Sequence, residues 1–245
     1  MSIGIIGGTG ALALFEPLET AALTTPFGPP SARPVRIEIA GRAAWFVARH
    51  GNPHRIPPHR VNYRANLHAL RTLGCRTVIA VSAVGGIDPD LEPGRLVAID
   101  QVIDYTWGRD HTYSDGPSAP LRHVEFARPF EGPARRALIE AASELGEPLA
   151  AEGCYAATQG PRLESAAEVR RLARDGCTVV GMTAMPEAGL ARELGMDYAN
   201  LCVVANPAAG VSDEPISEDE IHRELAAAMD RVRGVLAAAV RRLPE

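Results

Sequence analysis

Short apolar runs alternate along the chain with stretches in which apolar residues recur every three or four positions. Continuous apolar runs of this length are typical of buried strands, and we predict strands over residues 2–7, 35–40, 43–48, 77–83, 96–105, 154–159, 178–183 and 198–206. The helical periodicity predicts helices over about 60–73, 132–145, 164–174, 186–194 and 217–242. This alternation indicates an α/β fold. No internal repeat or low-complexity linker divides the chain, so we predict a single domain over 1–245.

Local sequence signals indicate where two of the helices begin, and they mark one long irregular connection. Ser217 and Glu220 in "SEDE" match a capping box, in which each side chain bonds the other residue's backbone. Pro186 suits a first helical position, where no backbone N–H is needed. Residues 106–128 are polar and follow neither period. Irregular segments of this length in compact proteins are commonly functional, and we expect the same of this one.

The composition narrows the class of protein. Of the 245 residues, 46% are hydrophobic and 22% charged, and the formal net charge is -5 with acids and bases mixed. We therefore expect no nucleic-acid partner, and no apolar run reaches the roughly 18 to 20 residues of a membrane span. The four cysteines form no CxxC pair and suit buried thiols in a reducing compartment. The N-terminus lacks the basic start of a signal peptide, so we predict a cytoplasmic location.

The first candidate for chemistry is "GIIGGTG" at residues 4–10, a strand that runs into glycines and Thr9. Such a turn presents backbone N–H groups to an anion. From Gly8 onward it also matches a dinucleotide-binding G-x-G-x-x-A pattern. Pro17 argues against that reading, because it interrupts the crossover helix which the dinucleotide fold requires. A tight turn without a ligand remains an alternative.

A basic segment, "ARHGNPHRIPPHRVNY" at residues 48–63, contains three histidines. A zinc site is disfavoured, because the prolines between the histidines prevent a shared helical face and the arginines repel a cation. Arg49 beside His50 at a strand end suits an oxyanion, phosphate especially. A solvated basic loop is the alternative.

Further polar groups follow other predicted strands. Ser82 precedes two glycines in "AVSAVGG", and Thr183 precedes the Pro186 helix. Each position also has a structural interpretation, as an ordinary junction between elements. Glu164 and Glu187 each fit an acid that complements a helix dipole. Because ligands bind outside the carboxyl ends of strands in open α/β sheets, the recurrence of anion-favouring groups predicts a phosphate site with a polar pocket beside it.

Five motifs occur in order over nearly the whole chain: "GIIGGTG", "ARHG", "VNYRANLHAL", "TQGPR" and "GMTAMPEAGLARELG". With them the chain resembles the trimeric purine nucleoside phosphorylase and methylthioadenosine phosphorylase family. "HRxPPHxVNYRANL" and "NPAAG" make it similar to the bacterial methylthioinosine phosphorylases within that family. The resemblance implies one α/β domain around a mixed, barrel-like sheet flanked by helices, and a homotrimer. It also implies phosphorolysis, in which phosphate attacks C1′ of a nucleoside and the free base leaves, without a metal or a cofactor.

The resemblance also assigns roles to residues of this chain. The positions that match the family's phosphate ligands are Thr9, Arg49, His50, Ser82, Ala83 and Thr183. Those that match the lining of the sugar and base pocket are Val84, Gly85, Leu163 and Met182. A residue from a neighbouring subunit covers the 5′ end in the family, and His123 is our candidate for it.

Three positions of the sequence predict which base and which 5′ group the substrate carries. Family members that cleave 6-aminopurines have an aspartate at the position of Asn206, whereas an amide offers both a donor and an acceptor. Members that cleave 6-oxopurines have a glutamate matching Glu164, which accepts from the N1–H of such bases. Where ordinary nucleosides are cleaved a histidine meets the 5′-hydroxyl, but here Ile216 occupies that stretch.

With Asn206, Glu164 and Ile216 at these positions, we predict phosphorolysis of 5′-methylthioinosine. We expect Asn206, Glu164 and His50 to be the catalytic residues. The products are hypoxanthine and 5-methylthioribose 1-phosphate. A methylthioadenosine phosphorylase or a general 6-oxopurine nucleoside phosphorylase is the nearest alternative. An NAD-dependent oxidoreductase and a non-catalytic nucleotide-binding protein are the more distant ones.

Overall fold

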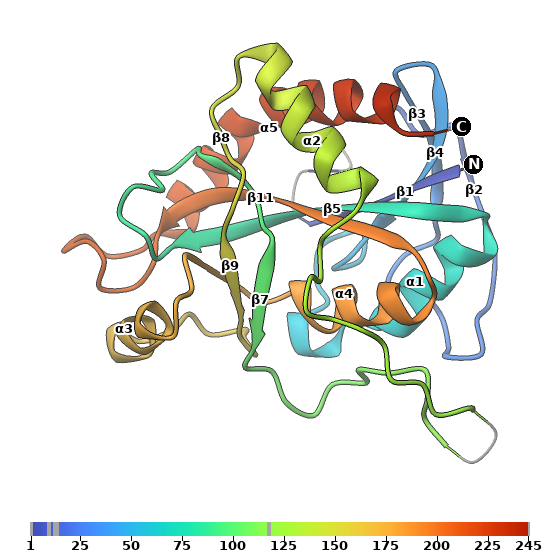
Figure 1. Ribbon diagram of the computed structural model, residues 1–245, viewed down its shortest axis with the longest axis horizontal. Coiled ribbons are helices and arrows are strands. Elements are labelled where there is room, and N and C mark those ends of the chain that lie inside the picture. Colours follow the sequence, from blue (N-terminus) through green and yellow to red (C-terminus); the bar gives the residue numbers. More distant parts are fainter. Residues whose placement is uncertain (1, 9–10, 12–14, 117–118, 245) are drawn as a thin grey trace.

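A mixed β-sheet forms the centre of the computed structural model (Figure 1), which describes residues 2–8, 11, 15–116 and 119–244. Thr9, one of the predicted phosphate ligands, lies outside the described residues. The sheet has 11 strands. They are β1 Ser2–Gly7, β2 Glu19–Thr20, β3 Val35–Ile39, β4 Arg42–Ala48, β5 Cys75–Gly86, β6 Leu96–Ala98, β7 Gln101–Asp104, β8 Leu149–Ala150, β9 Cys154–Ala157, β10 Val179–Gly181 and β11 Asp197–Pro207.

The 12-residue strand β5 organises the sheet by pairing with three others. On one edge it runs parallel to β11 along nearly its whole length. On the other edge it pairs first with β1, in parallel, and then with β10, in antiparallel orientation. The order β2-β3-β4-β1-β5-β10-β9-β7 therefore joins two groups of parallel strands that run in opposite directions. The predicted mixed α/β fold is confirmed.

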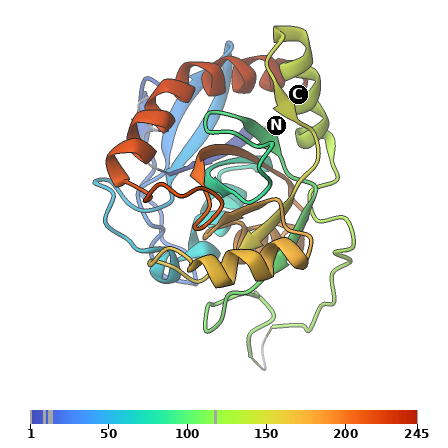
Figure 2. The ribbon, with the colours of Figure 1, turned by 90° about the vertical axis from the view of Figure 1, so that its left-hand side faces the viewer.

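Helices cover both faces of the sheet (Figures 1 and 2). They are α1 Tyr63–Thr72, α2 Pro133–Leu145, α3 Ala166–Arg174, α4 Ala184–Glu193 and α5 Glu218–Arg242, with a 3₁₀ turn at Pro58–Arg60. The long helix α5 packs with α2 against one face of β5 and β11, and α1 packs with α4 against the other. The smaller helix α3 packs against β9 and β10. Among the described residues, none of the helices combines the length and apolar character of a membrane crossing.

Side-chain hydrogen bonds explain why two elements differ from their predicted bounds. The predicted strand 96–105 is divided into β6 and β7, because the Asp100 carboxylate accepts the Gly153 backbone N–H at 2.7 Å and the chain changes its strand partners there. Helix α1 begins only at Tyr63, because the Asn62 side chain accepts from Ala65 N at 3.0 Å and caps it.

The predicted capping box of α5 is wrong. Ser217 occupies the N-cap position but makes no side-chain cap hydrogen bond, and Glu220 lies 3.7 Å from exposed Arg223 instead. A reciprocal capping box occurs at α3, between Ser165 and Glu168. All four cysteines are free thiols; Cys75, Cys177 and Cys202 are buried, as predicted, whereas Cys154 is half-buried.

Candidate active site

An opening in the edge of β5 forms the centre of the site. On that edge β1 pairs as far as Val81, and β10 pairs only from Gly85 onward. In the described part of the chain, residues 82–84 have no strand partner on that edge, so their backbone polar groups can bond a ligand. Ala83 is exposed although it lies in the middle of a central strand. A cavity of about 440 Å³ adjoins this opening.

Most of the predicted site residues line this one cavity, although they come from six separate stretches of the sequence. They are Arg49, His50, Ser82, Ala83, Val84, Gly85, Leu163, Glu164, Met182, Thr183, Asn206 and Ile216. The predicted strand 77–83 continues through Val84 and Gly85 to Gly86. His123 is exposed and does not line the cavity of its own chain. Its expected role concerns a neighbouring subunit and stays a prediction.

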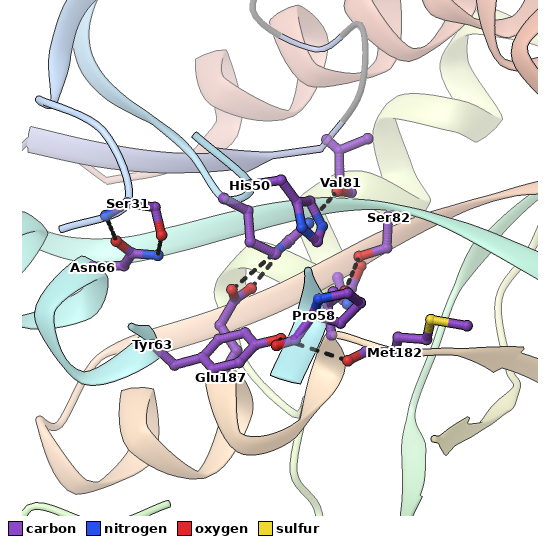
Figure 3. Close-up of polar contacts among 12 residues, drawn as sticks. Ser31, His50, Pro58, Tyr63, Asn66, Val81, Ser82, Met182 and Glu187 are labelled. Carbon is purple, nitrogen blue, oxygen red and sulfur yellow. Dashed lines mark hydrogen bonds and ion pairs between the residues drawn. The ribbon is translucent and has the colours of Figure 1, made fainter. Parts of the chain in front are cut away.

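Arg49 binds the buried carboxylate of Glu187, which is labelled in Figure 3. Its Nε and Nη2 donate to the two oxygens of Glu187 at 2.9 and 3.0 Å, and Nη1 donates to the Val81 carbonyl at 3.0 Å. Arg49 is 1% exposed and Glu187 is fully buried. Burial by itself would lower the pKa of Arg49, but the Glu187 charge outweighs it and keeps the pKa above the usual value.

Glu187 lies in the first turn of α4, as predicted, but its carboxylate is also buried and forms an ion pair with Arg49. Tyr198 also donates to it at 2.8 Å, so its two oxygens accept three hydrogen bonds. Guanidinium has five N–H groups, and two of those of Arg49 have no partner among the described residues. Arg49 lines the cavity and retains donors for an anion there.

The imidazole ring of His50 is neutral. Its Nδ1 lies 2.8 Å from the Ile56 carbonyl oxygen, which requires a proton on Nδ1, and its ring stacks on His54 at a centroid distance of 4.5 Å. Burial, and next the charge of Arg49, lower the pKa of His50 from 6.5 to about 4. At neutral pH the ring is therefore uncharged, and Nε2 is an acceptor.

The hydroxyl of Ser82, which is labelled in Figure 3, lies beside that of Thr183 near the pairing of β10 with β5. The oxygens of Ser82 and Thr183 lie 3.4 Å apart, and the backbone N–H of Thr183 donates to the Tyr155 hydroxyl at 3.2 Å. Thr183 makes no cap hydrogen bond to α4, so its hydroxyl is not used by the helix. Gly181 is needed here, because a Cβ at this residue would overlap the Tyr155 hydroxyl.

The lining of the cavity also includes an amide and a carboxylate. Asn206 follows an irregularity in the pairing of β11 with β5, and its Nδ2 donates to the Pro207 carbonyl at 2.6 Å. This bond uses one of the two amide hydrogens and leaves Oδ1 as an acceptor. Glu164 accepts from the Thr158 hydroxyl at 2.6 Å with one of its oxygens. Asn206 and Glu164 thus keep hydrogen-bonding capacity at a shared cavity.

An apolar wall of the cavity was not recognised from the sequence. Beside Ile216, it consists of Ile221, Leu225 and Met229 of α5. Their spacing of four residues places them on one helical face, and the sequence suggests only that this face is buried. In the described part of the chain, no group of three His, Cys, Asp or Glu side chains is arranged to hold a metal ion.

Comparison with known proteins identifies the type of site. Residues 2–241 match the family described as the phosphorylase superfamily. The chain belongs to the phosphorylase superfamily. It is 48% identical over 216 residues to a probable S-methyl-5′-thioinosine phosphorylase of Xanthomonas campestris pv. campestris, a match that covers 87% of this chain and 86% of the relative.

Other members of the superfamily differ in the nucleoside that their names carry. The S-methyl-5′-thioadenosine phosphorylase of Pyrococcus furiosus is 43% identical over 244 residues, which is 99% of this chain and 93% of the relative. The solved structure of methylthioadenosine phosphorylase from Schistosoma mansoni with adenine is 34% identical, covers 98% of this chain and 91% of that one, and has a TM-score of 0.93. The chain is therefore a nucleoside phosphorylase of the methylthioadenosine and methylthioinosine type, a pentosyltransferase.

Proposed function

We propose that this phosphorylase cleaves 5′-methylthioinosine with inorganic phosphate. The observation that carries the proposal is the composition of the single cavity just described. Asn206 and Glu164 line it together with the apolar residues Ile216, Ile221 and Leu225. Polar groups that match a 6-oxopurine and a wall that suits a methylthio group thus occur together.

Phosphate is expected at Arg49, Ser82 and Thr183. The free N–H groups of Arg49 and the two hydroxyls donate to its oxygens, and neutral His50 accepts from the O–H of hydrogen phosphate. Backbone groups of Ser82 and Ala83 along the open edge of β5 complete this subsite. No resident cofactor is needed in this scheme, because phosphate itself is the second substrate.

The reaction exchanges one bond at C1′ for another. A phosphate oxygen bonds to C1′ as the C1′–N9 bond breaks, its electron pair leaves on the base, and the base takes up a proton from water at N7. Oδ1 of Asn206 accepts that N7–H, its second amide hydrogen meets the 6-oxo group, and Glu164 accepts N1–H. Fixed partners of this kind stabilise the charge that develops in an oxocarbenium-like transition state. An adenine base lacks N1–H and would leave the second oxygen of Glu164, the one not bonded by Thr158, without a donor on the base.

Three nucleosides assayed in parallel test the proposal. Base release from methylthioinosine, methylthioadenosine and inosine is measured with and without phosphate. We expect the highest kcat/KM for methylthioinosine and no cleavage without phosphate. A higher kcat/KM for methylthioadenosine would refute the assignment in favour of the second candidate function, which the relatives from Pyrococcus and Schistosoma support by name.

We also propose that the active form is a homotrimer in which His123 reaches the 5′ end of a neighbouring site. His123 is exposed, as this role requires. Sedimentation analysis together with a His123→Ala variant tests both parts. A monomer with full activity would contradict them.

A further inference from the structure

Arg109 is the second arginine that is buried near the cavity, and no role in phosphorolysis has so far been given to it. It belongs to residues 105–132, the irregular segment that joins β7 to α2 and extends away from the sheet in Figure 1. Its side chain turns back into the protein, so that Arg109 is only 7% exposed. The burial of a whole guanidinium is costly unless its N–H groups find partners.

The guanidinium of Arg109 bonds two loops that carry site residues. Nη2 donates to the carbonyls of Thr158 and Gln159 at 3.1 and 2.8 Å. Nη1 donates to the carbonyls of Met182 and Met185 at 2.8 and 2.7 Å. The first pair belongs to the connection from β9 to α3, and the second flanks the junction of β10 with α4.

Each of these loops holds one part of the proposed substrate. Thr158, whose carbonyl Arg109 bonds, donates its hydroxyl to Glu164 at 2.6 Å. Met182 directly precedes Thr183, which faces Ser82 at 3.4 Å. Arg109 thereby joins the expected base subsite to the expected phosphate subsite through backbone carbonyls on both sides.

Two further contacts extend the link to a third loop. Arg109 lies over the Tyr63 ring at 5.6 Å, and its Nη1 is 3.4 Å from the Tyr63 hydroxyl. That hydroxyl donates to the Pro58 carbonyl at 3.0 Å, in the loop which follows His50. Nε completes the set by donating to the side-chain oxygen of Gln159 at 3.2 Å.

The partners of Arg109 differ from those of Arg49 in one chemical respect. Arg49 faces the Glu187 carboxylate, whereas the contacts of Arg109 with the described residues are all to neutral oxygens or to the Tyr63 ring. Only a planar fork with five N–H groups reaches carbonyls on two sides at once. A lysine would keep the charge but offers three donors at most.

We infer that Arg109 is a positioning residue for phosphorolysis, which sets the spacing between Glu164 and Thr183 and therefore between the base and the phosphate. This rests on the proposed reaction at the cavity but not on which methylthio nucleoside is used. Displacement of reacting groups by about 1 Å costs on the order of 100-fold in rate. Loss of Arg109 removes the hydrogen bonds that hold both loops and so changes the distance between Glu164 and Thr183.

Chemical rescue of an Arg109→Ala variant tests the inference. The substrate is whichever of methylthioinosine and methylthioadenosine the wild type cleaves with the higher kcat/KM. We expect its kcat/KM to fall about 100-fold in this variant. Guanidinium chloride at low millimolar concentration should then raise the kcat/KM of the variant at least tenfold. Arg109→Lys should fold, keep a thermal midpoint near that of the wild type, lose most of kcat and show no rescue. The matched control is Arg64→Gln, because Arg64 anchors the same segment through ion pairs with Asp110 and Asp115, and we expect near-normal kcat/KM for it.

The outcomes separate this inference from the proposed function. If the wild-type enzyme cleaves a nucleoside with phosphate and Arg109→Lys matches its kcat, the positioning role is refuted while the function stands. The positioning role is also refuted if the loss of activity in either variant is explained entirely by its lower thermal midpoint. It is refuted as well if Arg64→Gln loses as much activity. If Arg109→Ala does not fold, the Arg109→Lys result decides alone. An absence of wild-type turnover would overturn the proposed function and this inference with it.

Discussion

The buried histidine of the site makes the stability of the protein depend on pH in a calculable way. His50 has a folded-state pKa of about 4 against an ordinary value of 6.5. Between these values the unfolded chain binds a proton that the folded chain does not, so the free energy of unfolding rises with pH. The contribution is fully present above pH 6.5 and is lost as the pH falls through 4. At 1.36 kcal/mol for each unit, it amounts to about 3 kcal/mol.

Substitution isolates this contribution from other titrating groups. In His50→Asn the amide NH₂ can still donate to the Ile56 carbonyl, but no proton is taken up in this range. We expect urea unfolding from pH 7.5 to 4.5 to show a steeper loss of stability in the wild type than in the variant, with a difference approaching 3 kcal/mol. His123→Asn, at an exposed position, is the control and should keep the wild-type slope. Equal slopes in the wild type and His50→Asn would refute the reasoning.

Two further substitutions test other parts of the site. Glu187→Gln leaves the buried Arg49 charge uncompensated, so we expect a loss of about 3 to 5 kcal/mol in urea unfolding, against less than about 1 kcal/mol for Asp230→Asn in an exposed ion pair. A loss as small as that of the control would show that the pair does not stabilise the fold. Asn206→Asp replaces the amide donors by a carboxylate, and we expect kcat/KM for methylthioinosine to fall about 100-fold relative to methylthioadenosine. An unchanged ratio would mean that Asn206 does not recognise the base.

Elements with a strong one-dimensional pattern were predictable from the sequence. The strand 198–206 was recognised because its apolar run is continuous, and in the structure β11 is buried over most of its length. The helical periodicity of 217–242 likewise predicted helix α5, whose apolar side chains pack in the core. The capping box at Ser217 failed because sequence spacing does not show which partner an exposed carboxylate takes.

What escaped prediction depends on contacts between distant residues. Glu187 and Arg49 are 138 residues apart, and Glu187 at a helix start fits an ordinary first-turn acid. The antiparallel approach of β10 to β5 brings Thr183 to Ser82 from the opposite direction, whereas the sequence suggested strands ending at one edge. For residues 106–128 the sequence indicates a functional role, but nothing in it distinguishes Arg109 from the neighbouring charged residues.

The uninterrupted run of β5 through the site has a consequence for how the two substrates meet. Under the proposed function, Ser82 and Ala83 face phosphate while Val84 and Gly85 face the nucleoside, and these are consecutive residues of one strand. A strand advances about 3.3 Å per residue, and β11 fixes this one along its other edge. The residues expected to bind the two substrates are therefore held at a spacing that the covalent chain sets. The protein chain therefore contributes part of the effective molarity of phosphate at C1′. This contribution exists before either substrate binds, because the strand already fixes the spacing.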